Sequence, residues 1–504
     1  MAAVSAPPVR PSRLGAWLLP DFAATAAAAA VFFCFFVFHA QYSLFLDGDT
    51  GWHIRTGQLI LATFRVPHTD PFSVASQGKE WFAFEWLADC ILGAIEAWRG
   101  LPALAAFFVA VIAAAVWLWF RLHRFLGGSV VLAAAMGALV MTGTLLHWLA
   151  RPHVLAWIPL LLTMFYLERP QSRFGIRDGA AAAAVAAAWA NLHPSFLLAL
   201  ELALLYAAGR FLKGWLWPAV NRKREFARAR WYALAAACGF AGSLLNPWGV
   251  RLHAHVAAFL AQPDLLGLIA EWQPTNFGAA NGFQLSLTVL LALAGAAISL
   301  FRGRPDRSLA TVAVLFMAFR AVRGIPIAAL LLLPLANAAI TPELRRWPRW
   351  RGVDMIDAID GQRRGAAVIA FLLAAVVCWP MLPPVVATAG FPPALFPVAA
   401  ARALETLPAG SPVLATDVWG GYLIYRFRGA LRVFVDGRFD LHGIEPYLSL
   451  SRMLTMRPGW EYDLRAGGFA AALLPTRSPL VKGLQQRGWR LLYSDPLATA
   501  LAAP

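Results

Sequence analysis

Residues 22–53 read FAATAAAAAVFFCFFVFHAQYSLFLDGDTGWH, an apolar run that ends in a short polar motif. The apolar part, 22–40, has the length of a membrane span, since a transmembrane helix needs about 20 residues. It ends Phe38-His39-Ala40, without the small residues of a signal-peptide cleavage site. We therefore expect a retained first helix that places the motif DGDTGWH (47–53) at one face of a membrane.

The composition extends this expectation to the whole chain. The 504 residues are 60% hydrophobic and 14% charged, whereas about a quarter of a soluble domain is charged. The net charge of +16 does not indicate nucleic-acid binding, because the basic residues sit in short loops between apolar segments. The four cysteines lie in or beside apolar segments, which argues against a disulfide framework or a cysteine zinc site.

Ten further apolar segments follow the first one, and together they predict an α-helical polytopic membrane protein of about eleven transmembrane helices. They are 101–120, 129–149, 154–168, 179–190, 195–209, 231–245, 283–301, 308–320, 325–341 and 365–385. We take 179–190 and 195–209 as two short crossings, since one broken helix would move the basic run Arg222-Lys223-Arg224 to the outer side.

Basic residues predict the orientation. When the eleven segments are threaded alternately, one set of loops contains 23 Lys and Arg residues, beginning with Arg10, and the opposite set contains 8 outside the C-terminal region. The positive-inside rule places the richer set in the cytoplasm. We therefore expect a multi-pass protein of the cell inner (plasma) membrane, with a cytoplasmic N-terminus and a C-terminal region outside.

Two regions are expected outside the bilayer. The first outer loop, 41–100, includes an amphipathic pattern from Trp81 to Trp98 that predicts an interfacial helix. From 386 to 504, short strand-like runs (Val413–Ala415, Arg432–Val435, Ala470–Leu474 and Arg490–Tyr493) and a helix near 478–487 predict a small α/β domain. The expected division is thus 1–385, transmembrane, and 386–504, extracytoplasmic.

Carboxylates at the predicted outer face are candidates for chemistry. Asp47 and Asp49 have the spacing to hold a divalent cation such as Mg²⁺ or Mn²⁺, or to leave one as a general base; the alternative is a polar helix-to-loop turn. His53 and Arg55 beside them are candidate substrate-binding residues, although surface hydrogen bonding explains His53 equally well. Glu271 is either a further catalytic carboxylate or a rim charge. Charged residues at the membrane boundary of so apolar a protein favour a functional site over the structural alternatives.

Basic side chains recur at the same face. Arg151, His153 and His193 lie at helix breaks, where they either neutralise a phosphate or cap short loops. Arg320 and Arg323 are three residues apart and are expected to share a helix face, either as an anion clamp or by snorkelling to the interface.

The C-terminal region has its own candidates. Trp419-Gly420-Gly421-Tyr422 groups aromatic rings around a flexible turn, and the segment Asp436-Gly437-Arg438-Phe439-Asp440 follows a strand. Both segments are candidate substrate contacts, Trp419 and Tyr422 among them, with turn chemistry and domain packing as the alternative.

Three of these motifs, in the same order, resemble those of the GT-C superfamily of membrane glycosyltransferases, and are closest to oligosaccharyltransferase catalytic subunits. DGDTGWH (47–53) resembles the first-loop acidic motif of that family. Leu268-Ile269-Ala270-Glu271 is similar to its motif ending Ile-x-Glu, and Val418-Trp419-Gly420-Gly421-Tyr422 loosely to its Trp-Trp-Asp-Tyr-Gly motif. Arg320 or Arg323 falls where that family has an outer-edge arginine. The resemblance spans nearly the whole chain.

The sequence also departs from the family. A second acidic pair, which would help to hold a metal, is replaced by Arg151-Pro152-His153, and the Asp of the C-terminal motif is absent. A polyprenyl-phosphate sugar transferase with a glycan, lipid or protein acceptor therefore fits better than an enzyme that recognises a peptide sequon. The resemblance implies that Asp49 or Asp47 acts on the acceptor hydroxyl and that basic residues stabilise the leaving phosphate: Arg151, His153, Arg320 and Arg323.

Two other classes of function remain. A lipid-linked glycan ligase or polymerase would rely on Arg and His rather than on acids. A lipid-linked glycan transporter would show internal repeats and mid-membrane charges, which the sequence lacks, and a non-catalytic assembly subunit stays open.

Overall fold

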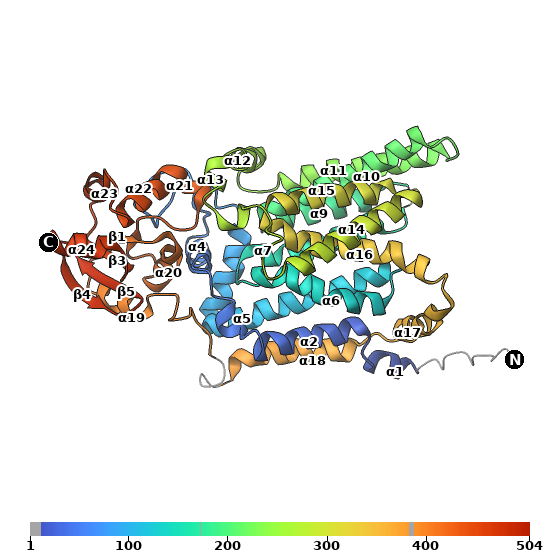
Figure 1. Cartoon of the computed structure of the whole chain (residues 1–504), viewed down its shortest axis with the longest axis horizontal. Coiled ribbons are helices and arrows are strands. Elements are labelled where there is room, and N and C mark those ends of the chain that lie inside the picture. Colours follow the sequence, from blue (N-terminus) through green and yellow to red (C-terminus); the bar gives the residue numbers. More distant parts are fainter. Residues whose placement is uncertain (1–11, 172, 383–387) are drawn as a thin grey trace.

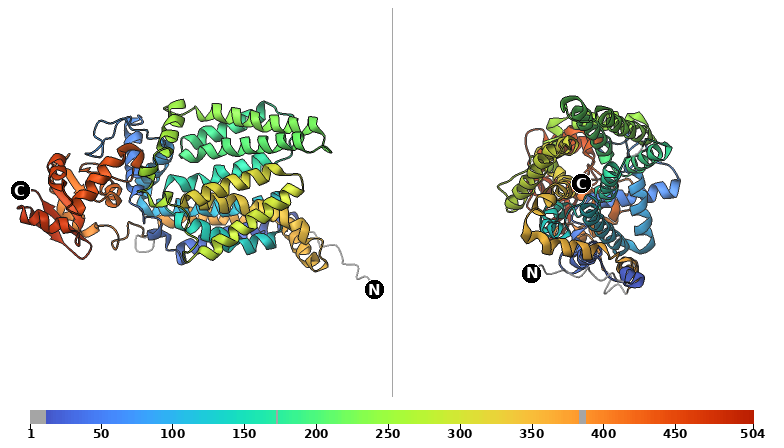
Figure 2. Two further views of the ribbon diagram at one scale, coloured as in Figure 1. Left: turned by 45° about the horizontal axis from the view of Figure 1, so that its top comes forward. Right: turned by 90° about the vertical axis from the view of Figure 1, so that its right-hand side faces the viewer.

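The computed structural model describes residues 12–171, 173–382 and 388–504, and shows a helical bundle capped at one end by a small α/β domain (Figure 1). The short helix α1 (Arg13–Leu18) and the C-terminal domain lie at opposite ends of the molecule (Figures 1 and 2). Arg10 and the expected domain boundary at 385–386 lie outside the described residues.

The expected multi-pass helical architecture is confirmed, because a helix forms at each predicted apolar segment. The bundle helices are α2 (Phe22–Phe36), α5 (Trp86–Phe125), α6 (Val130–Thr144), α8 (Trp157–Glu168), α9 (Ile176–Ala190), α10 (Leu197–Leu216), α11 (Arg222–Ser243), α14 (Gly282–Phe301), α15 (Pro305–Arg320), α16 (Ile325–Leu344) and α18 (Ala366–Cys378). Among the described residues, six helices are long and apolar enough to cross a membrane, or seven if one bent pair is a single span. The helix positions are thus as predicted, whereas eleven crossings are not established.

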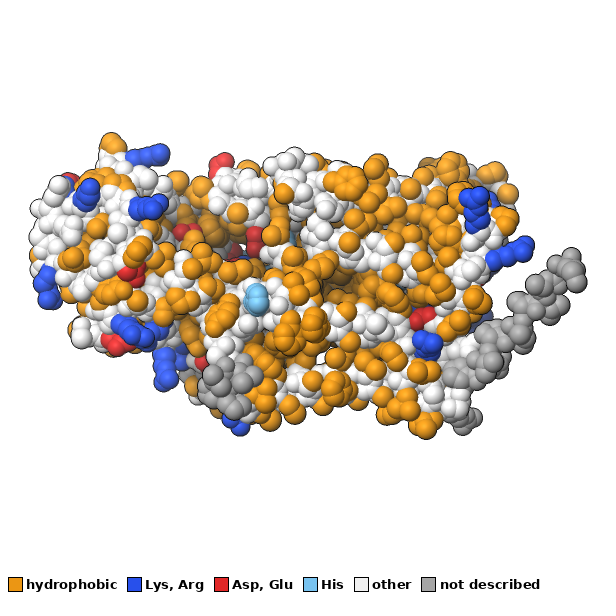
Figure 3. All heavy atoms as spheres, turned by 60° about the horizontal axis from the view of Figure 1, so that its bottom comes forward, with side chains coloured by type: hydrophobic (Ala, Val, Ile, Leu, Met, Phe, Trp, Pro, Cys, Tyr) orange, Lys and Arg blue, Asp and Glu red, His pale blue; other side chains and the backbone are white. Residues whose placement is uncertain are grey.

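The middle of the bundle surface is apolar, as a membrane environment requires. Figure 3 shows hydrophobic side chains over the central part of one face, with Lys and Arg gathered toward both ends. Helix α16 is the central element, since 83% of its most apolar window is buried inside the protein.

The basic loops gather at the end of the bundle away from the C-terminal domain. There Arg304 and Arg307 both bind Glu168, and Arg210 binds Asp306 at 3.1 Å. These residues belong to α8, α10 and α15, whose other ends face the C-terminal domain. Helices α9 and α10 are separate and antiparallel, joined by the short turn η2 (Pro194–Phe196), as the charge pattern required.

The first outer loop differs from the prediction. No separate interfacial helix spans Trp81 to Trp98; instead α5 begins at Trp86 and continues into the bundle, with a backbone break at Arg99 and Gly100. Gly100 has a φ of 69°, which glycine adopts at little cost, so two predicted helices are joined at a bend. Ahead of α5 the loop forms helices α3 (Ala40–Ser43) and α4 (Asp49–Thr63).

The C-terminal domain is an α/β unit with a five-stranded sheet in the order β2-β1-β3-β5-β4. Its strands are β1 (Pro412–Ala415), β2 (Arg432–Val433), β3 (Ala471–Pro475), β4 (Arg490–Ser494) and β5 (Ala498–Ala502), and its main helices are α20 (Asp417–Arg426), α22 (Ile444–Leu454), α23 (Trp460–Gly467) and α24 (Pro479–Gln486). The four predicted strands and the helix near 478–487 are present, whereas β5 and three helices were not predicted. The predicted flexible turn at Trp419–Tyr422 is wrong, because these residues form the middle of α20.

Glycines bring helix α20 of this domain against α4 of the first loop. A Cβ on Gly421 would lie 2.3 Å from the carbonyl oxygen of Gly48, and a Cβ on Gly51 would lie 2.2 Å from that of Gly421. Small residues permit such backbone approach. The motif following the first helix and the Gly-Gly pair of the C-terminal domain therefore form one packed unit.

We expect Gly421→Ala to lower the thermal unfolding midpoint of the purified protein, because the added methyl must push α20 away from α4; overpacking of this kind costs about 1–3 kcal/mol. Gly352→Ala is the matched control, since a Cβ there meets nothing within 4 Å. Equal midpoints for the two variants would contradict the close packing.

Candidate active site

Two contacts bring separate segments together at the end of the bundle beside the C-terminal domain. The backbone N–H of Ala150 donates to Leu44 at 2.8 Å, and the Thr50 hydroxyl donates to the Ala150 carbonyl at 3.1 Å. The loop between α6 and α7 (Pro152–Leu155) is thereby held against the start of α4. Asp47 accepts a hydrogen bond from the Asp49 N–H at 2.9 Å, which fixes the first turn of α4.

Arg151 is the centre of the cluster. Its guanidinium lies 2.6 Å from Asp47, 3.1 Å from Asp49 and 3.6 Å from Glu271. Burial alone would lower the pKa of Arg151, but these three carboxylates raise it above its ordinary value, so the guanidinium stays charged. The structure thus joins Asp47, Asp49, Arg151 and Glu271, four residues predicted from distant parts of the sequence.

Asp49 has the properties expected of a proton acceptor. Burial, together with the neighbouring charge of Asp47, raises the pKa of Asp49 to about 8 despite the opposing effect of Arg151. Its carboxylate lies directly against the backbone of Gly437 in the C-terminal domain, where a Cβ would come within 2.0 Å of the Asp49 Oδ1 atom. The C-terminal domain therefore forms one wall of the site.

Glu271 and Arg323 form the opposite side. Glu271 lies in the 3-10 turn η3 (Ala270–Trp272), 3.8 Å from Arg323, whose guanidinium stacks over Trp272 at 4.8 Å. Burial alone would raise the pKa of Glu271, but Arg151 and Arg323 lower it to about 2, so this acid is ionised.

Arg320 and Arg323 do not share a helix face, contrary to the prediction. Helix α15 ends at Arg320, Ala321 is extended with φ −150° and ψ 131°, and Arg323 belongs to the separate turn η4 (Val322–Gly324). Arg323 enters the cluster as a result, whereas Arg320 is exposed and makes none of the cluster's contacts. The i, i+3 argument fails because the helix stops between the two residues.

A second group of titratable residues lies beside the first. His53 is fully buried, with Nδ1 2.6 Å from Asp89 and Nε2 3.8 Å from Glu85. Burial keeps the pKa of His53 well below its ordinary value, so the imidazole is neutral. Glu85 also lies 3.7 Å from His193, and burial raises the pKa of Glu85 to about 8. The buried His53–Asp89 contact therefore joins α4 to α5.

The remaining predicted residues lie in different surroundings. His153 adjoins the cluster, with its ring 6.4 Å from that of His193 and its Nε2 2.9 Å from the His147 carbonyl oxygen. Arg55 hydrogen-bonds Gln58 at 3.3 Å instead of facing the carboxylates. Trp419 and Tyr422 are 5% and 3% exposed, so both belong to the packed interior and not to a substrate surface.

An ion-pair clamp was missed by the sequence reading. Arg438 is 2% exposed and bonds Asp436 at 2.7 and 2.5 Å and Asp70 of the first loop at 2.9 Å. Its guanidinium also lies 4.6 Å from the ring centre of Trp81. The segment 436–440 is a candidate substrate contact in the sequence analysis, but no local signal linked Arg438 to Asp70. Glu85 was also missed, although an acid directly before an apolar run at the outer face was an available signal.

The arrangement does not fit the divalent cation proposed for Asp47 and Asp49. Both carboxylates bind Arg151, which occupies the space between them and Glu271. Within the described ranges there is no group of three or more His, Cys, Asp or Glu side chains able to hold a metal ion. The cluster is a guanidinium surrounded by carboxylates.

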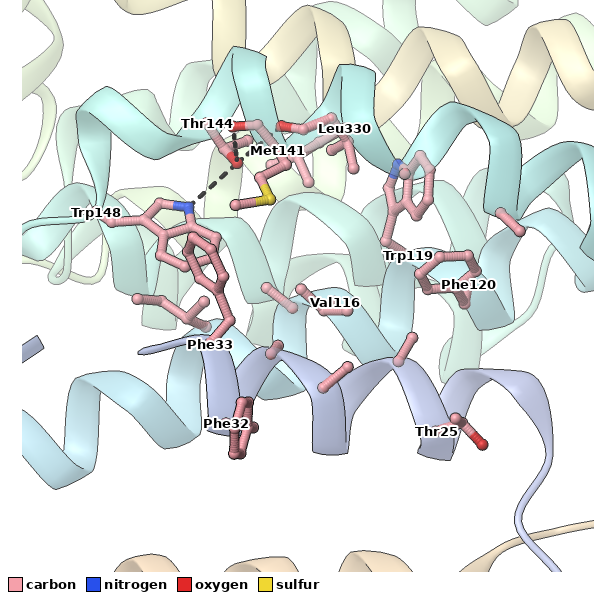
Figure 4. A pocket seen from close by; sticks show the side chains of 18 of the residues that line it. Thr25, Phe32, Phe33, Val116, Trp119, Phe120, Met141, Thr144, Trp148 and Leu330 are labelled. Atoms are coloured by element: carbon pink, nitrogen blue, oxygen red, sulfur yellow. Dashed lines mark hydrogen bonds between the residues drawn. The ribbon is translucent and has the colours of Figure 1, made fainter. Parts of the chain in front are cut away.

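An apolar groove of about 510 Å³ lies between α2, α5 and α6 (Figure 4). Among its lining side chains are Phe33, Val116 and Trp148, and Thr25 and Thr144 are its polar members. Trp148 donates to the Thr144 hydroxyl at 3.1 Å and lies three residues before Arg151. The groove therefore reaches the loop that carries the central arginine.

Comparisons with known proteins identify the fold. The chain is similar to the crystal structure of the Archaeoglobus fulgidus oligosaccharyltransferase in its apo form, with a TM-score of 0.57 and 13% identity over 90% of this chain and 69% of that chain. No family model matches the sequence, and no curated protein matches it. The expected GT-C-like fold, with its C-terminal domain, is thus confirmed at the level of architecture.

The raised pKa of Asp49 predicts how stability depends on pH. A carboxyl whose pKa is higher in the folded than in the unfolded protein binds its proton more tightly when folded, so its contribution to stability is lost as the pH rises through about 8. We expect the unfolding midpoint to fall between pH 6 and pH 9, and Asp49→Asn to reduce this fall. Glu85 accounts for part of the remainder, and Asp264→Asn, at an exposed acid, serves as control. An unchanged pH dependence in Asp49→Asn would rule out the proton on this carboxyl.

Proposed function

We propose that this protein is a membrane glycosyltransferase that moves a sugar from a polyprenyl-phosphate-linked donor to an acceptor at the outer face of the membrane. The observation that carries the proposal is the Asp47–Asp49–Arg151–Glu271 cluster, placed at the end of an apolar bundle, in which Arg151 shares a loop with Trp148 of an apolar groove. A lipid-linked phosphate has the matching shape, with an anionic head and an isoprenoid tail.

In this proposal Asp49 is the general base. The acceptor hydroxyl oxygen attacks the anomeric carbon, the hydroxyl proton passes to Asp49, and the bond from the anomeric carbon to the phosphate oxygen breaks with its electrons on the phosphate. Asp47 is less suited to this role, because one oxygen accepts the Asp49 N–H and the other binds Arg151. The raised pKa, about 8, makes the ionised form of Asp49 a stronger proton acceptor than an ordinary carboxylate.

The leaving phosphate is assigned to the cationic side of the site. Arg323 is 28% exposed at its side chain and pairs with Glu271 only at 3.8 Å, so it has donors left for phosphate oxygens. Such preplaced donors act where negative charge develops on the leaving group. Arg151 and the neighbouring imidazoles of His153 and His193 complete this side.

The groove is assigned to the isoprenoid tail. Exposed Phe32 and Val37 lie on its edge, so it opens on the lipid-facing surface of the bundle. Trp148 at the groove and Arg151 at the cluster belong to the same short loop, so a lipid with its tail beside Trp148 has its phosphate near Arg151. The C-terminal domain, which closes the site at Gly437, is assigned to the acceptor, whether glycan, lipid or protein.

The fold supports this proposal, because the solved structure that the chain resembles is named an oligosaccharyltransferase. The proposed location is the plasma membrane, with the cluster and C-terminal domain outside, as the distribution of basic loops predicts. A ligase or polymerase that uses only Arg and His is the second candidate, favoured by the convergence of Arg151, Arg323 and His193.

We expect Asp49→Asn to abolish the envelope glycan product and to cause its lipid-linked precursor to accumulate, with a loss of activity of about 10²–10⁴-fold, as is typical when a general base is removed. Envelope glycans are measured in cells that produce the variant at the normal level, with Asp264→Asn as the control. If Asp49→Asn and Asp47→Asn both leave the product unchanged while Arg323→Gln removes it, the acid-independent ligase replaces the proposal.

Filling the groove should weaken binding of the donor lipid. Gly137 lines the groove, and a Cβ there meets only Phe120 at 3.9 Å, so Gly137→Trp is expected to be accommodated and to occupy the space of the tail. Binding of a long-chain polyprenyl phosphate to protein in phospholipid nanodiscs should fall about tenfold, equivalent to about 1.4 kcal/mol. Leu290→Trp, on the exposed face of α14, is the control and should bind normally. Equal binding by both variants places the tail elsewhere.

A further inference from the structure

Three acids from two distant segments point at one guanidinium. Arg151 Nη1 lies 2.6 Å from Asp47 and 3.6 Å from Glu271, and its Nη2 lies 3.1 Å from Asp49. These acids come from residues 47–49 of the first loop and from η3, over two hundred residues later. Three carboxylates converging in a partly buried space repel one another unless a cation separates them. Here the separating cation is the guanidinium of Arg151, which belongs to the chain itself.

Charge and space both argue against a second cation in this place. Asp47, Asp49 and Glu271 carry at most three negative charges, and Arg151 and Arg323 supply two positive ones within 4 Å of them. The two guanidinium groups therefore already offset most of the negative charge of the three acids without a further ion. Mg²⁺ would need about six oxygens at roughly 2.1 Å, in the volume that the guanidinium fills.

The C-terminal domain covers one side of Asp49. The backbone of Gly437 covers the Asp49 carboxylate so closely that a Cβ there would lie 2.0 Å from Oδ1 and 2.5 Å from Oδ2. Both Asp47 oxygens are engaged as well, because Oδ1 accepts the Asp49 N–H and Oδ2 accepts Arg151. The Asp47 oxygens that a cation would need are therefore already hydrogen-bonded within the chain.

We propose that the guanidinium of Arg151 takes the position that a divalent cation would occupy among Asp47, Asp49 and Glu271, so that the site is assembled without a metal ion. The guanidinium holds the three acids whatever the reaction is; its contact with the donor phosphate rests on the proposed function. Unlike a metal ion, a guanidinium directs its N–H groups in one plane, and it fixes two carboxylates while a further donor faces a phosphate.

The test measures binding of Mn²⁺ alone to the purified full-length protein by electron paramagnetic resonance. The wild-type protein should show no site-specific Mn²⁺ binding. Arg151→Ser leaves three facing carboxylates without a cation, and we expect it to gain one Mn²⁺ site, with an affinity at least about tenfold above that of the wild type, a difference of about 1.4 kcal/mol. Adding Asp49→Asn to Arg151→Ser should remove the gained site.

Each outcome decides the question without a glycosyl-transfer assay. Stoichiometric Mn²⁺ binding by the wild type that Asp49→Asn abolishes would overturn the proposal, and so would a folded Arg151→Ser protein that binds no Mn²⁺. If Arg151→Ser is not recovered folded, Asp47→Asn/Arg151→Ser relieves the repulsion and still offers two carboxylates, so its Mn²⁺ binding gives the answer. Failure of the proposed function would leave these binding results unchanged.

Discussion

The site depends on one buried ion-pair clamp, in which Arg438 of the C-terminal domain binds Asp436 beside it and Asp70 of the first outer loop. All three are at most 5% exposed. Removing one partner of such a buried group leaves an uncompensated charge, which costs about 3–5 kcal/mol. The first loop and the C-terminal domain are therefore fixed relative to each other, although more than 300 residues separate them along the chain.

This clamp decides where Gly437 lies, and Gly437 in turn decides the environment of Asp49. Because Asp436 and Arg438 flank it, the Gly437 backbone is pressed against the Asp49 carboxylate. The first loop also adds backbone hydrogen bonds to the edge of the sheet, from Val74 to Val433 at 2.8 Å. The C-terminal domain thus contributes to the raised pKa of Asp49, through burial of the carboxyl and through the charge of Asp436, alongside the larger effect of Asp47.

The sequence predicted what depends on local pattern. Apolar runs gave the helix positions, and alternation with turn residues gave the strands at Val413 and Ala471, because these signals arise from neighbours along the chain. The sequence-based prediction failed where a short break in a helix, or a partner far away along the chain, decides which side chains come into contact. Arg320 and Arg323 are separated by one extended residue, and the partner of Arg438 is 368 positions away.

The sequence predicted which residues belong to the candidate site better than it predicted what each residue contacts. Asp47, Asp49, Arg151, Glu271 and Arg323 were all identified, since charged residues next to membrane spans are costly and are retained for a purpose. Their pairing was not, because Arg151 was expected to meet a phosphate and the two Asp residues a metal. Only the fold shows that Arg151 and the two Asp residues pair with each other.

Arginines and acids cluster at both ends of the bundle, but the two clusters have different roles. At the far end Glu168 is bound by Arg304 and Arg307 through four contacts of 2.8–2.9 Å, so its charge is fully compensated and its lone pairs are used. At the candidate site the ratio of acids to arginines is reversed, because three acids share the guanidinium of Arg151. An excess of cations satisfies a buried acid and makes a structural lock, whereas an excess of acids raises the pKa of one of them toward the neutral range. At the candidate site that acid is Asp49, which lies 3.1 Å from Arg151 and is the farther of the two first-loop acids from it.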